Sequence, residues 1–254
     1  MDSKRLLITA GCSFTEPTFY LEKNILPWPN IIADGAGFDL LNVGRGGAGQ
    51  DYISNAVIDA VMENQDRDPI VMVLWSEFSR INLYDYCTKW VSTNNKLLDT
   101  IPKPPFENMN PHVGMTMSEK DIMIARNQFR IMWRTKKFVE DLGFEFFAKI
   151  GISSLYQIMQ IADGGDREKR AIHYGMLRKN ILKDFYFLNS GITMKELEEG
   201  LPKHPKKGDD PQSFVDTGIF LECRHPNQAG HEIIADAFLG KYLKAHEPPV
   251  FIYD

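Results

Sequence analysis

The sequence predicts an α/β protein in which helices cover both faces of a parallel sheet. Four apolar segments of strand character follow one another along the chain, at residues 5–11, 39–43, 68–75 and 144–150. Helical patterns separate them, and this alternation is typical of a parallel sheet sandwiched between helices. A chain of 254 residues can bury the core of one large domain. We therefore expect a single domain over residues 1–254.

The first strand ends in a feature that suggests chemistry. The stretch Arg5–Thr15, RLLITAGCSFT, is an apolar run that stops at Gly11 and is followed almost at once by Ser13. In α/β proteins the carboxyl ends of the strands form the edge where ligands bind. Many buried strands also end in a glycine and a small polar residue, so Ser13 alone remains open between a catalytic and a structural interpretation.

The second strand runs into a glycine cluster. Asp39–Val43 is followed by Gly44–Gly49, and then by a helical pattern over Asp51–Asn64 with Asp51 as the expected N-cap. Such a loop can hold a phosphate on its backbone N–H groups, which would make the protein a nucleotide-binding module. The Lys-Ser/Thr pair of phosphate loops and the full dinucleotide spacing are both missing. The alternative is that the glycines only permit a tight turn.

The third and fourth strands enclose an irregular segment. Asp68–Trp75 is almost continuously apolar, as expected of a strand covered on both faces. Residues 81–115 are rich in aromatic residues, Asn and Pro, and we expect an irregular surface excursion that serves as a lid, binding loop or partner contact. A helix over Ser118–Leu142, with Ser118 as its N-cap and Gly143 after it, precedes the strand Phe144–Ile150.

The last third of the chain is less regular. We expect helices near residues 166–180 and 193–199, a solvated loop at the basic run Pro202–Lys207, and a final helix after Pro226 with Asn227 as its cap. The apolar face expected for this final helix consists of Ile233, Ile234, Ala237, Phe238 and Tyr242. The tail PPVFIYD is typical of an extended arm that pairs with an edge strand or with another subunit of an oligomer or assembly.

Composition excludes several classes of protein. The net charge of −5 argues against a nucleic-acid binder, and no apolar run is long enough to span a bilayer. The start of the chain does not have the pattern of a cleaved signal peptide. Cys12, Cys87 and Cys223 are odd in number and widely spaced, which favours free thiols in a reducing compartment. We expect a cytoplasmic protein, or a virion component that is assembled inside a cell.

A second polar group lies near the carboxyl end of the chain. Glu222 and His225 are three residues apart, immediately before the final helix. Together with Ser13 they form a serine, histidine and carboxylate set. Cys223 and His231 lie in the same segment, but the spacing matches no common zinc pattern. We therefore expect no metal and no cofactor, and we expect His231 to cap or pack at the start of the helix.

Three motifs in this order resemble the sequence blocks of the SGNH, or GDSL-type, hydrolases. The motifs are Gly11-Cys-Ser13, Asn42-Val-Gly-Arg-Gly-Gly47, and Glu222-x-x-His225-Pro-Asn-x-x-Gly230. The His-Pro-Asn-x-x-Gly run is the most specific of them. The resemblance implies a flavodoxin-like, three-layer α/β/α fold and an esterase, lipase, thioesterase or carbohydrate O-deacetylase activity. The regions at about 80–115 and 152–215 have no counterpart in the blocks and would be insertions.

The resemblance also implies roles for the site residues. Ser13 would be the nucleophile, His225 its general base, and Glu222 the group that orients the imidazole. The backbone N–H groups of Ser13 and Gly47 would form the oxyanion hole. Asn42 would line the site. We expect a small-molecule or carbohydrate ester as the substrate. The irregular insertions, their aromatic residues and the lack of an extended apolar lid fit an O-acetyl group on a sugar better than a long lipid chain.

The third block departs from the family pattern. The family has Gly-x-Asn-Asp after the third strand, and its Asn donates to the oxyanion, whereas this chain has Trp75-Ser-Glu77-Phe78. An ionised Glu77 only accepts hydrogen bonds and would repel the developing charge. Either Ser76 or Arg80 supplies a substitute donor, or the site is slow, or it is silent. The alternative to an esterase is therefore a structural or binding protein that kept the fold, such as a component of a phage particle. Cys12 replaces the Asp of the first block, and we expect it to be a small buried residue.

Overall fold

Four parallel strands form the central sheet. The computed structural model describes residues 4–78, 80–84, 90–94, 117–151, 167–201, 212 and 215–246. Within these residues the sheet has the strand order β2-β1-β3-β6. Its strands are β1 (Leu6–Gly11), β2 (Asp39–Asn42), β3 (Ile70–Trp75) and β6 (Glu145–Ile150). All four predicted strand segments are therefore confirmed.

The burial of each strand follows its place in the sheet. Every residue of the central strands β1 and β3 is buried, which explains why their sequences are almost continuously apolar. The outer strands β2 and β6 are only partly buried. Gly11 pairs with Leu74 in register, so β1 and β3 end side by side. The segments that follow these two strands therefore start at the same edge of the sheet.

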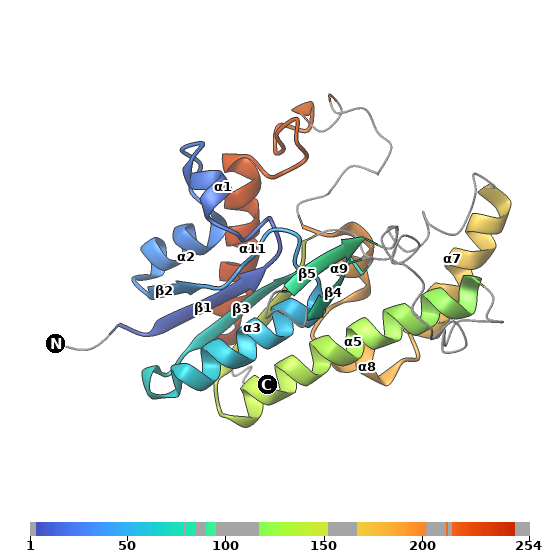
Figure 1. Cartoon of the computed structure of the whole chain (residues 1–254), viewed down its shortest axis with the longest axis horizontal. Coiled ribbons are helices and arrows are strands. Elements are labelled where there is room, and N and C mark those ends of the chain that lie inside the picture. The colour runs from blue at the N-terminus through green and yellow to red at the C-terminus, as the bar shows by residue number, and fades with distance from the viewer. Residues whose placement is uncertain are drawn as a thin grey trace, which may run out of the picture.

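Helices cover both faces of the sheet (Figure 1). On one face lie α2 (Trp28–Ala36) and α11 (Gln228–His246), which contact each other. On the other lie α3 (Gln50–Glu63) and α5 (Met117–Asp141), which also pack together. This arrangement is the predicted three-layer α/β/α fold.

Three details of the helix predictions were wrong. Helix α5 begins at Met117, so Ser118 lies inside the helix rather than at its cap. The N-cap of α3 is Gly49, so Asp51 lies in the first turn of the helix rather than at its cap. In α11 the side chain of Ile233 is exposed, whereas Ala235 is buried. The predicted cap Asn227 is confirmed, because its Oδ1 accepts a hydrogen bond from the N–H of Gly230 at 3.1 Å.

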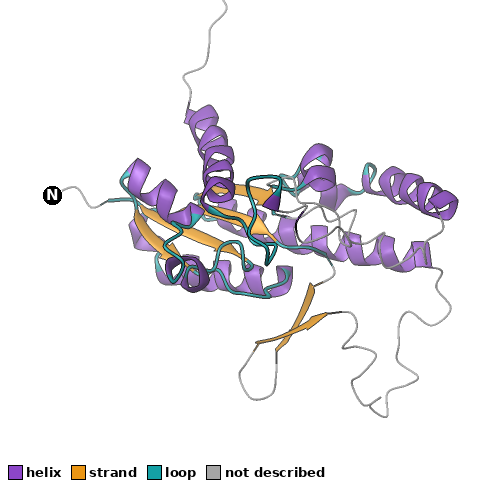
Figure 2. Cartoon of the chain, turned by 90° about the horizontal axis from the view of Figure 1, so that it is seen from above, coloured by secondary structure: helices purple, strands orange, loops and turns teal. Residues whose placement is uncertain are grey.

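The region expected to be irregular contains a β-hairpin. Strands β4 (Arg80–Tyr84) and β5 (Trp90–Asn94) pair in antiparallel fashion. Figure 2 shows the hairpin projecting from the layered core, and β4 contacts α3. The expectation of a fully irregular segment over 81–115 was wrong at these strands, because alternating aromatic and polar residues can also form a short two-stranded ribbon. Residues 85–89 and 95–116 lie outside the described residues.

The remaining described elements are short helices. They are α1 (Thr18–Leu21), η1 (Gln65–Arg67), α7 (Arg167–Ile181), α8 (Phe185–Asn189) and α9 (Met194–Glu199). The last of these confirms the helix predicted near 193–199, and it has a capping box between Thr193 and Glu196. Helices α7 and α8 both pack on α5. The basic run at 202–207 and the C-terminal arm lie outside the described residues.

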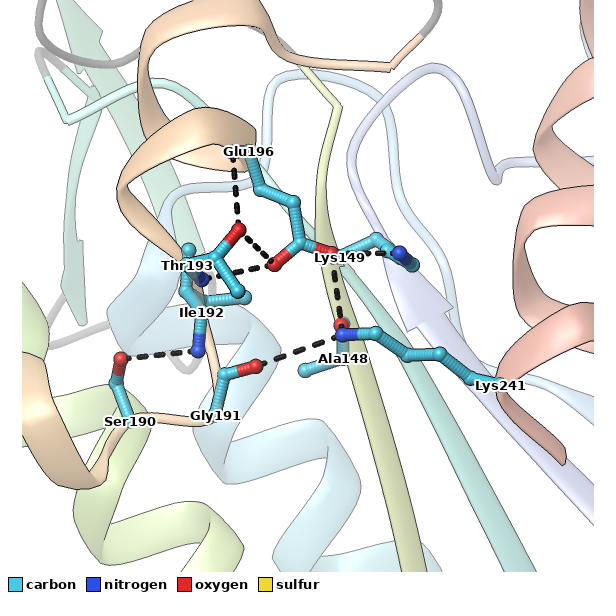
Figure 3. A network of polar contacts seen from close by, with 8 residues as sticks. All are labelled: Ala148, Lys149, Ser190, Gly191, Ile192, Thr193, Glu196 and Lys241. Atoms are coloured by element: carbon cyan, nitrogen blue, oxygen red, sulfur yellow. Dashed lines mark hydrogen bonds and ion pairs between the residues drawn. The ribbon is translucent and has the colours of Figure 1, made fainter. Parts of the chain in front are cut away.

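A partly buried ionic network anchors two helices to the outer strand β6 (Figure 3). The Glu196 carboxylate of α9 accepts from Lys149 Nζ of β6 at 2.5 Å and lies 3.1 Å from Lys241 Nζ of α11. Lys241 Nζ also donates to the carbonyl of Ala148 at 2.8 Å. In this network the Glu196 carboxylate contacts the ammonium groups of two lysines, one on β6 and one on α11. It therefore holds α9 and α11 against the sheet edge.

No helix in the described part of the chain is long and apolar enough to cross a membrane.

Candidate active site

Ser13 lies in a tight turn directly after β1. The carbonyl of Cys12 accepts hydrogen bonds from the N–H groups of Thr15 and Glu16, at 2.8 and 3.1 Å, and this closes the turn. A Cβ atom on Gly11 would lie 2.1 Å from Thr15 Oγ1, so only glycine fits there. The turn leaves Ser13 partly exposed, whereas both of its neighbours are buried.

The glycine-rich loop after β2 is locked against this turn. Asn42 Nδ2 donates to the carbonyl of Thr15 at 2.8 Å, and Asn42 Oδ1 accepts from the N–H of Gly44 at 2.9 Å. A Cβ on Gly44 would approach the Thr15 side chain to 2.8 Å. Asn42 thus joins the two loops, and Gly44 allows their close approach. Gly47, the second predicted oxyanion donor, adopts a positive φ of 75° in the same loop.

His225 belongs to a turn that is built by its own motif. The N–H of Leu221 donates to the carbonyl of His225 at 2.8 Å, and Phe220 forms an isolated antiparallel bridge with Pro226. A Cβ on Gly230 would lie 2.4 Å from the carbonyl oxygen of Ile219. The glycine of the His-Pro-Asn-x-x-Gly run is therefore required by packing. The motif fixes the backbone from which the imidazole projects.

The imidazole of His225 packs against the segment that follows Ser13. Its ring centroid lies 5.9 Å from that of Phe14, 5.0 Å from that of Phe19 and 6.4 Å from that of Tyr20. These contacts bring the two ends of the chain together, as the predicted serine and histidine pair requires. The aromatic residues that surround the imidazole were not predicted, because nothing in their spacing marks them as neighbours of His225.

The environment of His225 favours its neutral form. Burial lowers the pKa of the imidazole, and the nearby positive charge of Arg80 lowers it further. Its Nδ1 lies 3.1 Å from the carbonyl oxygen of Cys223. A carbonyl only accepts, so the neutral ring carries its proton on Nδ1 and its lone pair on Nε2. This is the tautomer that a general base needs.

Glu222 is not brought to His225. The Glu222 side chain is exposed, and among the described residues no hydrogen bond joins its carboxylate to the imidazole. The acceptor at Nδ1 is instead the backbone carbonyl of Cys223. The sequence could not show this, because a carbonyl is present at every position and gives no signal.

A partly buried ion pair lies just after β3. Glu77 Oε1 lies 2.9 Å from Arg80 Nε, and the two side chains are 16% and 18% exposed. The Glu77 carboxylate thus forms an ion pair with Arg80, and the guanidinium compensates its negative charge. Burial alone would lower the pKa of Arg80, but the adjacent Cys12 and Glu77 raise it above its usual value, so the guanidinium stays charged. Its Nη1 is buried and has no hydrogen-bond partner among the described residues.

Ser76 and Gln50 connect the third block to the glycine loop. Gln50 is fully buried at the start of α3, and its Nε2 donates to the carbonyl of Ser76 at 2.6 Å. Ser76 is also fully buried, so it lies at the strand end as predicted but below the protein surface. Gln50 was missed by sequence reasoning, because a polar residue at the first position of a helix is usually solvated.

The remaining predicted residues of this region are buried. Cys12 is fully buried, as expected, and lies beside the Arg80 guanidinium. His231 is fully buried at the start of α11, where its Nδ1 accepts from the N–H of Trp28 at 3.3 Å. Burial lowers the pKa of His231 to about 3, so this ring is neutral. The expected packing role of His231 is confirmed.

Solved structures similar to this chain were found, whereas no family model and no curated protein sequence matches it. The psychrotrophic esterase EstA from Pseudoalteromonas sp. is 10% identical, with a TM-score of 0.46, over 94% of this chain and 99% of the esterase. A GDSL-like lipase from Bacteroides thetaiotaomicron is 8% identical, with a TM-score of 0.45, over 96% of this chain and 89% of the lipase.

A third structure is a catalytic mutant of an acetylxylan esterase from Geobacillus stearothermophilus. It is 12% identical, with a TM-score of 0.39, over 95% of both chains. These three similar structures are thus two esterases and one lipase, and the lipase is described as GDSL-like.

Proposed function

We propose that the protein is an ester hydrolase of the SGNH type, with Ser13 as nucleophile and His225 as general base. The observation that carries the proposal is the position of the imidazole. Its ring packs against Phe14, the residue after Ser13, in its neutral form and with Nδ1 on a carbonyl oxygen. A serine hydroxyl becomes an effective nucleophile when such a base accepts its proton.

The proposed reaction has two steps. Ser13 Oγ attacks the ester carbonyl while His225 Nε2 accepts the hydroxyl proton. The bond to the alcohol breaks, and the imidazolium returns the proton to the leaving oxygen. Water then attacks the acyl-enzyme by the same route, releases the acid and restores Ser13. In this scheme the N–H groups of Ser13 and Gly47 bind the oxyanion.

Arg80 is proposed to stabilise the oxyanion in place of the family's Asn, which donates a hydrogen bond to it. Its guanidinium is held by Glu77 and acts electrostatically on the imidazole of His225. A fixed cation near the reacting groups stabilises negative charge that develops in the transition state. Glu77 then serves as the partner of Arg80 rather than as a repulsive charge.

We propose a short acyl group as the substrate, such as an acetyl group on a carbohydrate hydroxyl. Bulky aromatic rings pack around His225, and two of them, Phe14 and Tyr20, are buried. Rings so close to the base limit the space for a long acyl chain. A sugar alcohol as leaving group can extend away from these rings.

The first test is hydrolysis of p-nitrophenyl acetate by the wild type and by Ser13→Ala. We expect turnover that disappears in the variant, and labelling of Ser13 by a fluorophosphonate, read by mass spectrometry. The control is Thr18→Ala, which removes an exposed hydroxyl a few residues away and should leave both signals intact. Equal rates for the wild type and Ser13→Ala would disprove the serine mechanism.

A second candidate function is a silent binding or structural protein, such as a part of a phage particle. The observation in its favour is the exposed Glu222, which makes no hydrogen bond to His225 among the described residues. A wild-type protein that neither turns over acetyl esters nor reacts with the fluorophosphonate would support this candidate. Association with a larger assembly would then be the property to measure.

A further inference from the structure

A hollow of about 490 Å³ lies between α3, α5 and α8, outside the residues assigned to the ester reaction. Its walls come from the first turn of α3, the first half of α5 and the start of α8. The lining residues are Asp51, Met123, Ile124, Arg126, Asn127, Gln128, Arg130 and Tyr186. Binding sites for small molecules commonly have volumes of about 300–1,000 Å³, so the hollow can hold one or two rings.

The position of the walls is fixed by packing. Ser54 and Thr135 share a buried hydrogen bond of 2.7 Å, which joins α3 to α5 close to the hollow. The Asp184 carboxylate caps α8 and lies 3.1 Å from Arg126 Nε of α5. These contacts join all three helices. The hollow is therefore part of the folded structure and not a gap between loops.

Two acceptor groups in the hollow can take further donors. Gln128 is only 3% exposed, and its Oε1 has no hydrogen-bond partner among the described residues. Asp51 is half-buried, burial raises the pKa of its carboxyl, and no described residue forms an ion pair with it. Buried acceptors without donors are costly, and a ligand that donates hydrogen bonds would satisfy them.

The hollow also offers donors and an aromatic ring. Arg130 Nη2 donates to Asn127 Oδ1 at 2.5 Å, and the Arg126 guanidinium lies 5.7 Å from the ring centroid of Tyr186. Each guanidinium has five N–H groups, so these contacts leave further donors on both. The hollow therefore presents acceptors, donors and an apolar surface together.

This combination selects a neutral ligand rich in hydroxyl groups. An anion would be attracted by the two arginines but repelled by the Asp51 carboxylate. A cation would be attracted by Asp51 but repelled by the two arginines. A hydroxyl group donates to a carboxylate or amide oxygen and accepts from a guanidinium. The C–H face of a sugar ring can pack on Tyr186 and Met123.

We propose that this hollow is a binding site for a neutral sugar unit, separate from the site of ester cleavage. It lies at the start of α3, on the side of the molecule to which the carboxyl ends of the sheet strands point. A glycan bound there would be held on the same side as Ser13. The binding itself does not depend on catalysis, so the proposal stands even if the ester activity is absent.

The test is saturation-transfer NMR and calorimetric titration with cellobiose, xylobiose, maltose and N,N′-diacetylchitobiose, each added to the wild type. We expect at least one to bind with a Kd of about 1 mM or tighter. Asp51→Asn and Arg130→Ala should each weaken that binding about two- to tenfold, the effect of losing one hydrogen bond. Gln128→Leu, which keeps the side-chain size, should weaken it similarly.

The matched control is Arg134→Ala, which removes the same charge from an exposed position of α5 outside the lining residues. It should bind the sugar like the wild type. Melting temperatures verify that each variant is folded. Inorganic phosphate is titrated as the anionic probe. Saturable phosphate binding without disaccharide binding, or no binding of any of these sugars, would overturn the proposal. Sugar binding that Asp51→Asn, Arg130→Ala and Gln128→Leu all leave unchanged would also overturn it.

Discussion

Glu77 and Arg80 form a partly buried ion pair just after β3, with 2.9 Å between Oε1 of Glu77 and Nε of Arg80. Judged from the sequence alone, Glu77 is a problem for an esterase, because a carboxylate near the oxyanion opposes the reaction. The ion pair changes this interpretation. Glu77 pairs with and positions a guanidinium that stays charged, and that guanidinium lies beside Cys12 and influences His225. The effect of Glu77 on the reaction therefore depends on its ion pair with Arg80.

Arg80→Ala is expected to lower kcat for acetyl ester hydrolysis by about 10²–10³, the effect of losing one oxyanion-stabilising group. KM should change little, because the charge acts mainly in the transition state. The variant also leaves Glu77 without its partner, so we expect a lower melting temperature. Steady-state kinetics and thermal unfolding measure the two effects separately.

The control for this prediction is the double variant Glu77→Gln/Arg80→Ala. It removes both charges, so most of the lost melting temperature should return while kcat stays low. Recovery of kcat together with stability would show that Arg80 is only a structural partner of Glu77.

Glu222→Gln is expected to reduce kcat by less than about tenfold. The carbonyl of Cys223 still accepts from Nδ1 of His225, so the imidazole keeps its orientation and tautomer. Removing a carboxylate that does orient the histidine of a triad costs about 10⁴ in kcat. A loss of that size would restore the assignment of Glu222 made from the sequence. His225→Gln is the reference for complete loss of the base.

The pH dependence of kcat/KM should report the lowered pKa of His225. Burial and the charge of Arg80 disfavour the imidazolium, so the neutral base persists below the ordinary histidine pKa of about 6.5. We therefore expect activity to be lost on the acid side, with its midpoint below pH 6.5. An NMR titration of the His225 ring protons gives the same pKa without activity.

Arg80→Leu removes one of the two causes of the lowered pKa. The midpoint from the ring protons should then move upward, toward the ordinary value. Because burial is the larger cause, the shift should be partial. A midpoint that is unchanged in the variant would mean that Arg80 does not act on His225.

The layered fold could be predicted because its signals are local. Continuous apolar segments identified β1 and β3, and Asn227 identified the start of α11. The hairpin was missed because strands of five residues leave little periodicity to detect. Helix α2 was also missed, although Pro29 in its first turn and Gly37 after its end are ordinary start and stop signals.

The site could be predicted only where its residues belong to motifs. Ser13 and His225 follow from motif order, and the structure places the His225 ring against the residue after Ser13. The contact between Glu77 and Arg80, and the burial of Gln50, depend on how the end of β3 packs against α3. The carbonyl that accepts from His225 has no sequence signature. Such features arise from tertiary packing and could not be predicted from spacing.

The network around Glu196 predicts a pH-dependent contribution to stability. Burial on its own would raise the pKa of this carboxyl, but Lys149, the backbone at Thr193 and Lys241 outweigh it, so the pKa is lowered. A carboxyl with a lowered pKa in the folded state stabilises the fold above its unfolded pKa of about 4.3. That contribution is lost as the pH falls through the lower folded value. At neutral pH, Glu196→Gln should cost about 2 kcal/mol, because both ammonium groups lose their counter-charge in a partly buried site. Urea unfolding at pH 7 and pH 3 measures the free energy of unfolding, and the difference in that free energy between wild type and variant should shrink at the lower pH.

The control is the double variant Glu196→Gln/Lys149→Met. It should recover part of the lost free energy of unfolding, since one unpaired charge is then removed. A difference that is equally large at both pH values would show that the ionised carboxylate is not what stabilises this edge of the sheet.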